Sequence, residues 1–496
     1  MRLKVIAAMS AIGAALFAGG CSSARSSAPT SFDGYFDQVI DWGDCGSGFG
    51  QDFQCATIAA PTSWRDPSIG SIDVALIRRA ALGDDSLGSL LFNFGGPGGS
   101  GVEALNSAYF RLAIPIRQNF DIVSFDQRGV GRSTRVICGT DAEKYEFLTA
   151  DFTDDDAGLA ELAERNAAWG QACYTNTGAL LGNVDAMSVA RDMELMRHLL
   201  GDEKLNFIGF SYGSRLGTAY AGLFPNRVGR FVLDGVVPSL SPEEWSLGQA
   251  VGFENALRSY VTDCLTQLNC PFTGTADQAL AKVTALLLQA RETPFPTTTG
   301  RYLNRSLLSN GIAVNLYSQN SWTQLTNAFA ELINRGRGDL FLRFAETWMG
   351  KNPDGSFNSD LFTMISVTGC LRGAASADPE TMATNAQYLI EAAPTMGWWF
   401  SHGGLTCRDW PVPPVIDDFD VHATGAPPIL VIGTTGDSAT PYEWAVHLAD
   451  TLDSGVLLTL EREQHTAYLS GNHCIDRAVN EFLLTGELPP DGKICR

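Results

Sequence analysis

One serine in the middle of this chain stands where an apolar run meets a glycine-bounded turn. The run Leu205 to Phe210 predicts a buried strand, and the small-residue pattern after Gly213 predicts a helix. Between them lies Gly-Phe-Ser-Tyr-Gly, with Ser211 at its centre. A serine on a sharp strand–turn–helix connection has its hydroxyl exposed above the sheet edge. We therefore predict that Ser211 is a nucleophile rather than an ordinary turn serine.

A serine nucleophile needs a base within hydrogen-bond reach and an acid that orients that base. On this type of turn the chain order is serine, acid, histidine. Of the six histidines, His465 follows the last predicted strand, at 455–460, where a loop can place it over the sheet edge. We predict His465 as the base. His473, beside Cys474, is the alternative, and His447 falls in a predicted helix.

The predicted acid is Asp437, in a glycine-bounded turn directly after the predicted strand 428–434. An aspartate at this place can instead serve only as a cap for the helix that begins near Pro441. Its spacing from the strand end favours the catalytic role. Thr440 is expected to cap that helix rather than to contact the acid.

Acyl transfer also needs N–H donors for the oxyanion. One predicted donor is the main-chain N–H of Tyr212, directly after the nucleophile. The others are expected from the glycine-rich loop Gly95 to Gly101, at Gly96 and Gly98, because glycines let the backbone approach the substrate. A phosphate-binding loop is the alternative interpretation, but this stretch lacks the lysine of a P-loop.

Strand and helix patterns alternate around these residues. Apolar runs predict strands at 71–80, 89–94, 120–125, 205–210, 230–237, 428–434 and 455–460. The helical patterns between them imply a mainly parallel sheet covered on both faces. From 239 to 420 helical patterns continue without the alternation of strands and helices. We predict an α/β fold whose core, 32–238 and 421–496, is interrupted by a large helical cap insert at 239–420.

Four motifs together resemble the α/β-hydrolase serine peptidases of the prolyl iminopeptidase and secreted actinobacterial tripeptidyl aminopeptidase group. They are Gly-Gly-Pro-Gly after a strand, D-x-R-G-x-G-x-S at 126–133, Gly-Phe-Ser-Tyr-Gly, and G-x-x-G-D-x-x-T-P at 433–441. The resemblance implies an α/β-hydrolase core, a helical cap over the site, and release of short peptides from free N-termini. It assigns the nucleophile, acid and base to Ser211, Asp437 and His465.

In such peptidases, cap carboxylates hold the substrate ammonium. Glu243 and Glu244, directly after the predicted strand 230–237, are the candidates, although acids are also enriched in the first turn of any helix. A carboxylic-ester hydrolase on the same fold is the alternative function, because fold and triad do not select the leaving group. The intact serine, aspartate and histidine argue against a non-enzymatic envelope-anchored binding protein.

The chain of 496 residues carries a formal charge of −21, so we expect no binding to nucleic acid or to anionic membrane surfaces. The expected partner is a peptide or protein substrate. The sequence has no C-x-x-C pair or Cys/His cluster, and we expect neither a metal nor a cofactor. It does not indicate an oligomeric state.

The N-terminus has the pattern of an exported protein. Residues 1–20 have a short basic region and an apolar, alanine-rich run, which predict a signal peptide. Small residues before Cys21 resemble a bacterial lipobox, so we predict a lipid on Cys21 and a tether at 21–31. Cleavage further on, for instance after Ala28, is the alternative.

Setting Cys21 aside, ten of the 11 cysteines remain, and an even number in an exported chain predicts disulfides. We expect pairing between sequence neighbours: Cys45/Cys55, Cys138/Cys173, Cys264/Cys270, Cys370/Cys407 and Cys474/Cys495.

Overall fold

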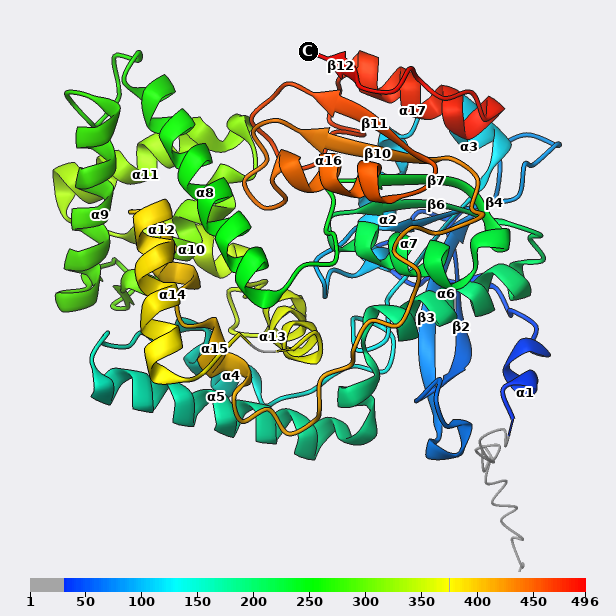
Figure 1. Cartoon of the computed structure of the whole chain (residues 1–496), viewed down its shortest axis with the longest axis horizontal. Helices are drawn as coiled ribbons and strands as arrows, with labels where there is room; N and C mark the ends of the chain where they lie inside the picture. The colour runs from blue at the N-terminus through cyan, green and yellow to red at the C-terminus, as the bar shows by residue number, and fades with distance from the viewer. Residues whose placement is uncertain (1–30, 374) are drawn as a thin grey trace, which may run out of the picture.

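The computed structural model describes residues 31–373 and 375–496 (Figure 1). Within them a ten-stranded sheet has the order β1-β2-β3-β5-β4-β6-β7-β10-β11-β12. The strands are β1 (Gly43–Asp44), β2 (Gln54–Pro61), β3 (Ser71–Arg79), β4 (Ser89–Asn93), β5 (Asp121–Phe125), β6 (Leu205–Phe210), β7 (Val228–Asp234), β10 (Ile429–Thr434), β11 (Gly455–Leu460) and β12 (Lys493–Cys495). Pairing is antiparallel from β1 to β5 along the sheet and parallel from β5 to β12. This topology confirms the predicted α/β-hydrolase core.

Helices cover both faces of the sheet, and each face has its own apolar cluster. One cluster packs α6 (Ala186–Leu200), α7 (Tyr212–Leu223) and α16 (Tyr442–Thr451) against the strands. The other packs α2 (Gly101–Ala108), α3 (Ile114–Asn119) and α17 (His473–Thr485) against the opposite face. Because both faces are covered, every residue of β4 and β10 is buried, which explains their continuous apolar sequences.

The cap is the helical insert between β7 and β10, drawn to the left of and below the sheet in Figure 1. It contains α8 (Pro242–Cys264), α9 (Ala276–Glu292), α10 (Arg305–Leu316), α11 (Trp322–Arg335), α12 (Asp339–Trp348), α13 (Leu361–Leu371), α14 (Pro379–Ala392) and α15 (Gly403–Cys407), with the short pair β8 (Phe295–Pro296) and β9 (Tyr302–Leu303). Helices α8 to α12 share an apolar cluster of their own. The cap therefore has a core separate from the two clusters that cover the sheet.

Two helices outside the insert pack against it. These are α4 (Asp141–Thr149) and α5 (Asp156–Thr177), which lie below the cap helices in Figure 1. The Tyr145 hydroxyl donates to Glu346 at 2.8 Å, and the Asn304 amide donates to the carbonyl of Thr149 at 2.7 Å. The predicted boundaries place this segment in the core. Its contacts with α10 and α12 were not visible in the sequence because they join distant parts of the chain.

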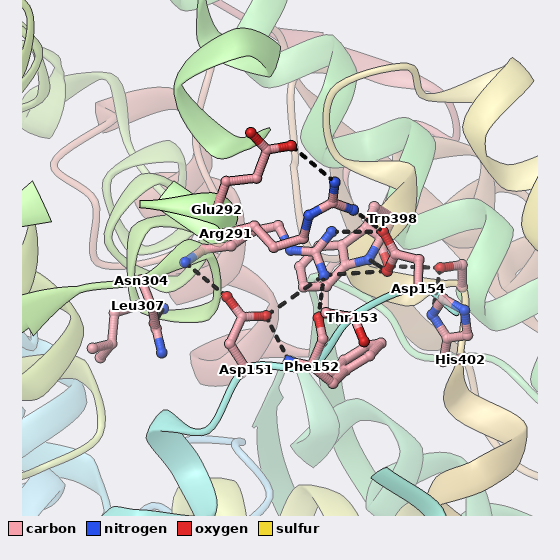
Figure 2. A network of polar contacts seen from close by, with 12 residues as sticks. Asp151, Phe152, Thr153, Asp154, Arg291, Glu292, Asn304, Leu307, Trp398 and His402 are labelled. Carbon is pink, nitrogen blue, oxygen red and sulfur yellow. Dashed lines mark hydrogen bonds and ion pairs between the residues drawn. The ribbon is translucent and has the colours of Figure 1, made fainter. Parts of the chain in front are cut away.

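The linker between α4 and α5 is held to the cap by a polar network (Figure 2). Asp154 accepts from Arg291 of α9 at 2.6 Å, from Arg305 of α10 at 3.0 Å and from the Trp398 indole at 2.7 Å. Asp151 accepts the main-chain N–H of Arg305 at 3.0 Å. Three cap segments therefore meet at one acidic linker, which fixes α4 and α5 against the cap.

The strands near the two edges of the sheet differ from the sequence-based prediction, whereas the disulfides agree with it. β1, β2 and β12 were not predicted from the sequence. All five disulfides join the predicted neighbours, including Cys370–Cys407, which connects α13 to α15. The signal peptide and Cys21 lie outside the described residues. No helix among residues 31–373 and 375–496 is long and apolar enough to span a membrane.

Candidate active site

Ser211 occupies the turn from β6 into α7. It has a φ of 52°, a left-handed conformation that is uncommon for a residue with a side chain. Its main-chain N–H donates to the carbonyl of Asp234, at the end of β7, at 2.8 Å. This bond anchors the turn to the neighbouring strand. The backbone conformation is the strained one expected for a nucleophile on this connection.

The two glycines that flank the turn are required by close approach. A Cβ on Gly209 would lie 2.3 Å from the carbonyl oxygen of Gly213, and one on Gly213 would lie 2.6 Å from that of Asn93. Neither contact leaves room for a side chain, because the nearest atoms are main-chain atoms. The Gly-Phe-Ser-Tyr-Gly pattern is therefore explained by the packing of this turn against β4.

His465 and Asp437 form a buried pair at the carboxyl ends of β11 and β10. The Nδ1 atom of His465 lies 2.9 and 2.8 Å from the two carboxylate oxygens of Asp437. The Asp437 side chain is fully buried and that of His465 is 11% exposed. Since Nδ1 faces the carboxylate, Nε2 remains available to a hydroxyl or a leaving group. His473, the alternative base, is instead the first residue of α17.

Thr440 contacts both members of this pair. Its hydroxyl donates to Asp437 at 2.9 Å and lies 3.1 Å from Nδ1 of His465. The prediction that Thr440 caps the following helix is wrong, because α16 begins at Tyr442 with Pro441 at the N-cap and no side-chain cap. The main-chain N–H groups of Ala439 and Thr440 also donate to Asp437, at 2.9 and 2.8 Å. The turn thus holds the carboxylate from several sides.

A second carboxylate, Asp234, lies buried behind the histidine loop. It accepts the main-chain N–H of Ala467 at 2.9 Å and that of Tyr468 at 2.7 Å. Burial raises the pKa of Asp234 to about 7, although these two bonds and the charge of His465 oppose the rise. Burial alone would lower the pKa of His465, but the carboxylates of Asp437 and Asp234 raise it above its usual value.

The three predicted oxyanion donors have different surroundings. Gly96 and Tyr212 line one cavity together with Ser211. Tyr212 is the first residue of α7, so its N–H has no intrahelical carbonyl to bond. Gly98 does not line this cavity, and a Cβ there would lie 2.7 Å from the carbonyl of Asp360. The structure brings two of the three to the serine and packs the third against the start of α13.

Two cavities meet at Ser211. The cap cavity, of about 200 Å³, lies between the serine and the cap and is lined largely by aromatic side chains, namely Tyr212, Trp245, Phe253, Tyr317, Trp348, Phe362, Trp399 and Phe400. The histidine-side cavity, of about 380 Å³, is lined by His465, Phe94, Phe210 and Tyr468. A substrate that spans both would place its scissile bond at the serine.

Glu243 and Glu244 line neither of these two cavities. They line a third one, of about 280 Å³, on the other side of α8. Glu244 accepts the main-chain N–H of Ser241 at 2.9 Å in a capping box, and Glu243 accepts that of Ser376 at 3.3 Å. Phe400 lines both the third cavity and the cap cavity. The two glutamates are therefore separated from the serine by α8.

Several site residues were not predicted from the sequence. Tyr317 packs edge-on against the His465 ring with 5.2 Å between ring centroids, and Arg372 lines the cap cavity. Neither residue lies in a motif. Asp234, the last residue of β7, lies inside the predicted strand 230–237, and a charged residue within that apolar run was a signal that could have been used. No group of three or more His, Cys, Asp or Glu side chains in the described parts of the chain is arranged to hold a metal ion.

The chain is similar to known hydrolases along almost its whole length. A family model described as TAP-like protein matches residues 393–495. Serine protease Hip1 of Mycobacterium tuberculosis is 34% identical over 477 residues, covering 92% of this chain and 91% of that protein. Carboxylesterase B of the same organism is 35% identical over 452 residues, covering 89% and 86%. Tripeptidyl aminopeptidase of Streptomyces lividans is 27% identical over 471 residues, covering 92% and 86%.

These relatives match nearly the whole chain, and the first two exceed 30% identity. Their names agree with the arrangement at Ser211, where a strained serine, a histidine and a buried aspartate meet at the carboxyl end of a parallel sheet. The chain belongs to the α/β-hydrolase serine peptidase family that includes serine protease Hip1 and the tripeptidyl aminopeptidases.

Proposed function

We propose that this serine hydrolase is an exopeptidase that releases short peptides, tripeptides in particular, from free N-termini through an acyl-enzyme. The observation that supports this most is the position of Ser211 beneath the cap, at the meeting point of two cavities. A covered serine admits the end of a chain more readily than a folded loop. The relative named tripeptidyl aminopeptidase supports the same function.

In the proposed reaction Ser211 Oγ attacks the substrate carbonyl and His465 Nε2 takes its proton. Asp437 orients the imidazole and stabilises the imidazolium that forms. The N–H groups of Gly96 and Tyr212 stabilise the oxyanion. His465 then gives the proton to the leaving amine, and water hydrolyses the acyl-enzyme with the same histidine as base.

Recognition of the substrate N-terminus requires an anion, because a buried ammonium without a partner is costly. Glu243 and Glu244 are the proposed partners, and Phe400 is the residue that their cavity shares with the cap cavity. This role requires the substrate to extend past Phe400. Its test is Glu243→Gln, with Glu292→Gln as the control, since Glu292 ends α9 and pairs with Arg291. Only the first variant should reduce the preference for free N-termini.

The alternative is a carboxylic-ester hydrolase, which the relative named Carboxylesterase B supports. Hydrolysis rates of free and N-acetylated tripeptide anilides, beside those of a short-chain aryl ester, separate the two. We expect cleavage of the free anilides, with acetylation lowering kcat/KM by at least ~10-fold, or about 1.4 kcal/mol. Equal rates on free and acetylated peptides contradict recognition of the N-terminus. Fast ester turnover without peptide turnover contradicts the peptidase.

We also propose that the protein acts outside the cytoplasm, held in the cell envelope by a lipid on Cys21. The five disulfides support export, because such bonds persist in oxidising compartments. Mass spectrometry of the mature N-terminus tests the anchor. We expect an acylated Cys21, and an unmodified chain that starts after Ala28 would contradict it.

A further inference from the structure

The cap cavity contains one charged side chain. Among the described residues that line it, Arg372 is the only ionisable cation, and none is an aspartate or a glutamate. The other lining side chains are aromatic, aliphatic or neutral polar groups. A cavity of this kind repels a substrate ammonium close to Arg372 and attracts an anion.

Arg372 is held in place by its main chain, and its guanidinium forms no hydrogen bond to any described residue. It is the C-cap of α13, where its main-chain N–H donates to the carbonyls of Thr368 and Gly369, both at 3.2 Å. The guanidinium lies over the ring of Trp245, with Cζ at 4.3 Å from the ring centroid. Its Nε is buried and has no hydrogen-bond partner in the part of the chain that the structure describes.

Three buried arginines of this protein have carboxylate partners, whereas the partly buried Arg372 has none among the described residues. Arg128 pairs with Asp192 at 2.6 Å, Arg305 pairs with Asp154 at 3.0 Å, and Arg215 pairs with Asp417. Within residues 31–373 and 375–496 no carboxylate lies at ion-pair distance from Arg372. The carboxylate whose charge acts on its pKa is that of Asp417, which raises it and which pairs with Arg215. Arg372 is only partly buried, so its guanidinium is accessible from the cavity and can pair with an anion there.

Arg372 remains a cation at neutral pH. Burial, together with the nearby charge of Arg215, lowers the pKa of Arg372 to about 10, which still leaves it protonated. Burial raises the pKa of the Tyr212 phenol to about 12, and the charges of Arg215 and Arg372 oppose that rise. Arg372 lines the same cavity as Ser211 and Tyr212, so an anion bound by Arg372 lies in the cavity that contains the nucleophile.

The two cavities divide the substrate between them. His465 must deliver a proton to the leaving group, so the leaving group belongs in the cavity that His465 lines. The acyl part of the substrate then occupies the cap cavity, where Arg372 lies. The planar guanidinium matches the geometry of a carboxylate.

We propose that Arg372 binds the side-chain carboxylate of an aspartate or glutamate in the acyl part of the peptide. This inference deepens the proposed function and rests on it. The released peptide has its acidic side chain at Arg372 and its ammonium away from Arg372, on the side of Phe400. The overall charge of −21 repels acidic substrates at long range, so a preference for acidic side chains would have to come from a local site such as Arg372.

The test uses the mature, disulfide-bonded protein and tripeptide anilides that carry Glu or Gln at each of the three positions, at about 0.15 M salt to screen long-range repulsion. We expect kcat/KM for Glu to exceed that for Gln by at least ~10-fold at one position. Arg372→Gln should reduce this ratio to about 1, whatever the effect of the substitution on the rate with Gln substrates. Arg372→Lys should retain part of the preference. Arg258→Gln, an exposed change on α8 with the same loss of charge, should leave the ratio unchanged.

A ratio near 1 at all three positions, or a preference that persists in Arg372→Gln, overturns the proposal. Longer peptides with a free C-terminal carboxylate are also compared with the same peptides carrying a C-terminal amide. If the free carboxylate is preferred more strongly than the acidic side chain, and this preference depends on Arg372, the leaving group lies at Arg372 and the proposal is overturned. If no anilide is cleaved, the proposed peptidase activity is contradicted. The anion site is then tested with esters, by comparing hydrolysis of a neutral aryl ester with that of an analogue whose acyl chain ends in a carboxylate. An Arg372-dependent preference for the acidic ester supports the anion site, and equal rates overturn it.

Discussion

The main-chain N–H of His465 donates to the carbonyl oxygen of Tyr317 at 2.8 Å, so the proposed base is hydrogen-bonded directly to the cap. A second bond runs in the same place, from the N–H of Gln319 to the carbonyl of Glu463 at 2.9 Å. The loop that carries the histidine therefore joins the end of α10 as a short extension of the cap. The same contact therefore holds the cap over the serine and positions the proposed base.

The first prediction concerns the triad. Ser211→Ala and His465→Ala should each lower kcat by on the order of 10⁴-fold or more, because nucleophile and base act as a unit. Asp437→Asn should lower kcat by a smaller factor than either of these changes. His473→Ala, at the start of α17, should leave kcat unchanged. Kinetics on the best anilide provide the measurement. An inactive His473→Ala beside an active His465→Ala would show that the base is assigned incorrectly.

The second prediction concerns Thr440. Thr440→Val keeps the shape of the side chain but removes the hydroxyl that Asp437 accepts, so kcat/KM should fall by ~10-fold or more, as for a bond to a charged group. Thr440→Ser should retain most of the rate. The control is Thr434→Val, because the buried hydroxyl of Thr434 has no partner among the described residues. Equal losses in both valine variants would contradict a specific role for Thr440.

The third prediction concerns the disulfide that joins α13 to α15. Replacing Cys370 and Cys407 by serine should lower the free energy of unfolding by about 3–4 kcal/mol, since the two lie 37 residues apart. Replacing Cys45 and Cys55, 10 residues apart at the sheet edge, should cost about 1 kcal/mol less. Urea unfolding measures both, after peptide mapping without reduction has verified the pairs. An unchanged stability in both variants would contradict the predicted constraint.

The core, and the positions of Ser211, Asp437 and His465 at the ends of strands, could be predicted from the sequence because their signals are local. A strand, a glycine-bounded turn and a helix follow one another around Ser211, and Asp437 and His465 come directly after strands. Arg372 had no such signal, because its surroundings depend on Trp245, a residue from a different helix. Glu243 and Glu244 lie in the first turn of α8, the helix that borders the cap cavity. Which side of α8 faces the serine is decided by packing, and it is the side of Trp245, Gln249 and Phe253.

The fourth prediction is the pH dependence of the reaction. The general base must be neutral, and the Asp437 and Asp234 carboxylates raise the pKa of His465 above its usual 6.5, against the effect of burial. The value of kcat/KM should therefore fall as pH decreases through a pKa above 6.5, by about tenfold for each further pH unit. A rate profile from pH 5 to pH 9 measures it. A midpoint below 6.5 would contradict the raised pKa.

The last prediction separates the charge of Asp234 from its packing. Its carboxylate accepts two successive N–H groups just after the histidine and also raises the pKa of His465. Asp234→Asn removes the charge, so the acid limb of the kcat/KM profile should shift to lower pH. The amide presents one acceptor and one donor to two N–H groups, so kcat at high pH should also fall, by ~10-fold for one lost bond.

A merely structural role for Asp234 would reduce the rate at every pH without moving the midpoint, and that outcome would contradict the electrostatic part of the argument. Asp476→Asn serves as the matched control, because Asp476 is also a partly buried carboxylate that accepts a main-chain N–H from the histidine loop, that of Leu469, at 3.0 Å. The charge of Asp476 does not contribute to the raised pKa of His465. This variant should therefore leave the midpoint in place. A shift in Asp234→Asn without one in Asp476→Asn assigns the effect to the carboxylate behind the proposed base.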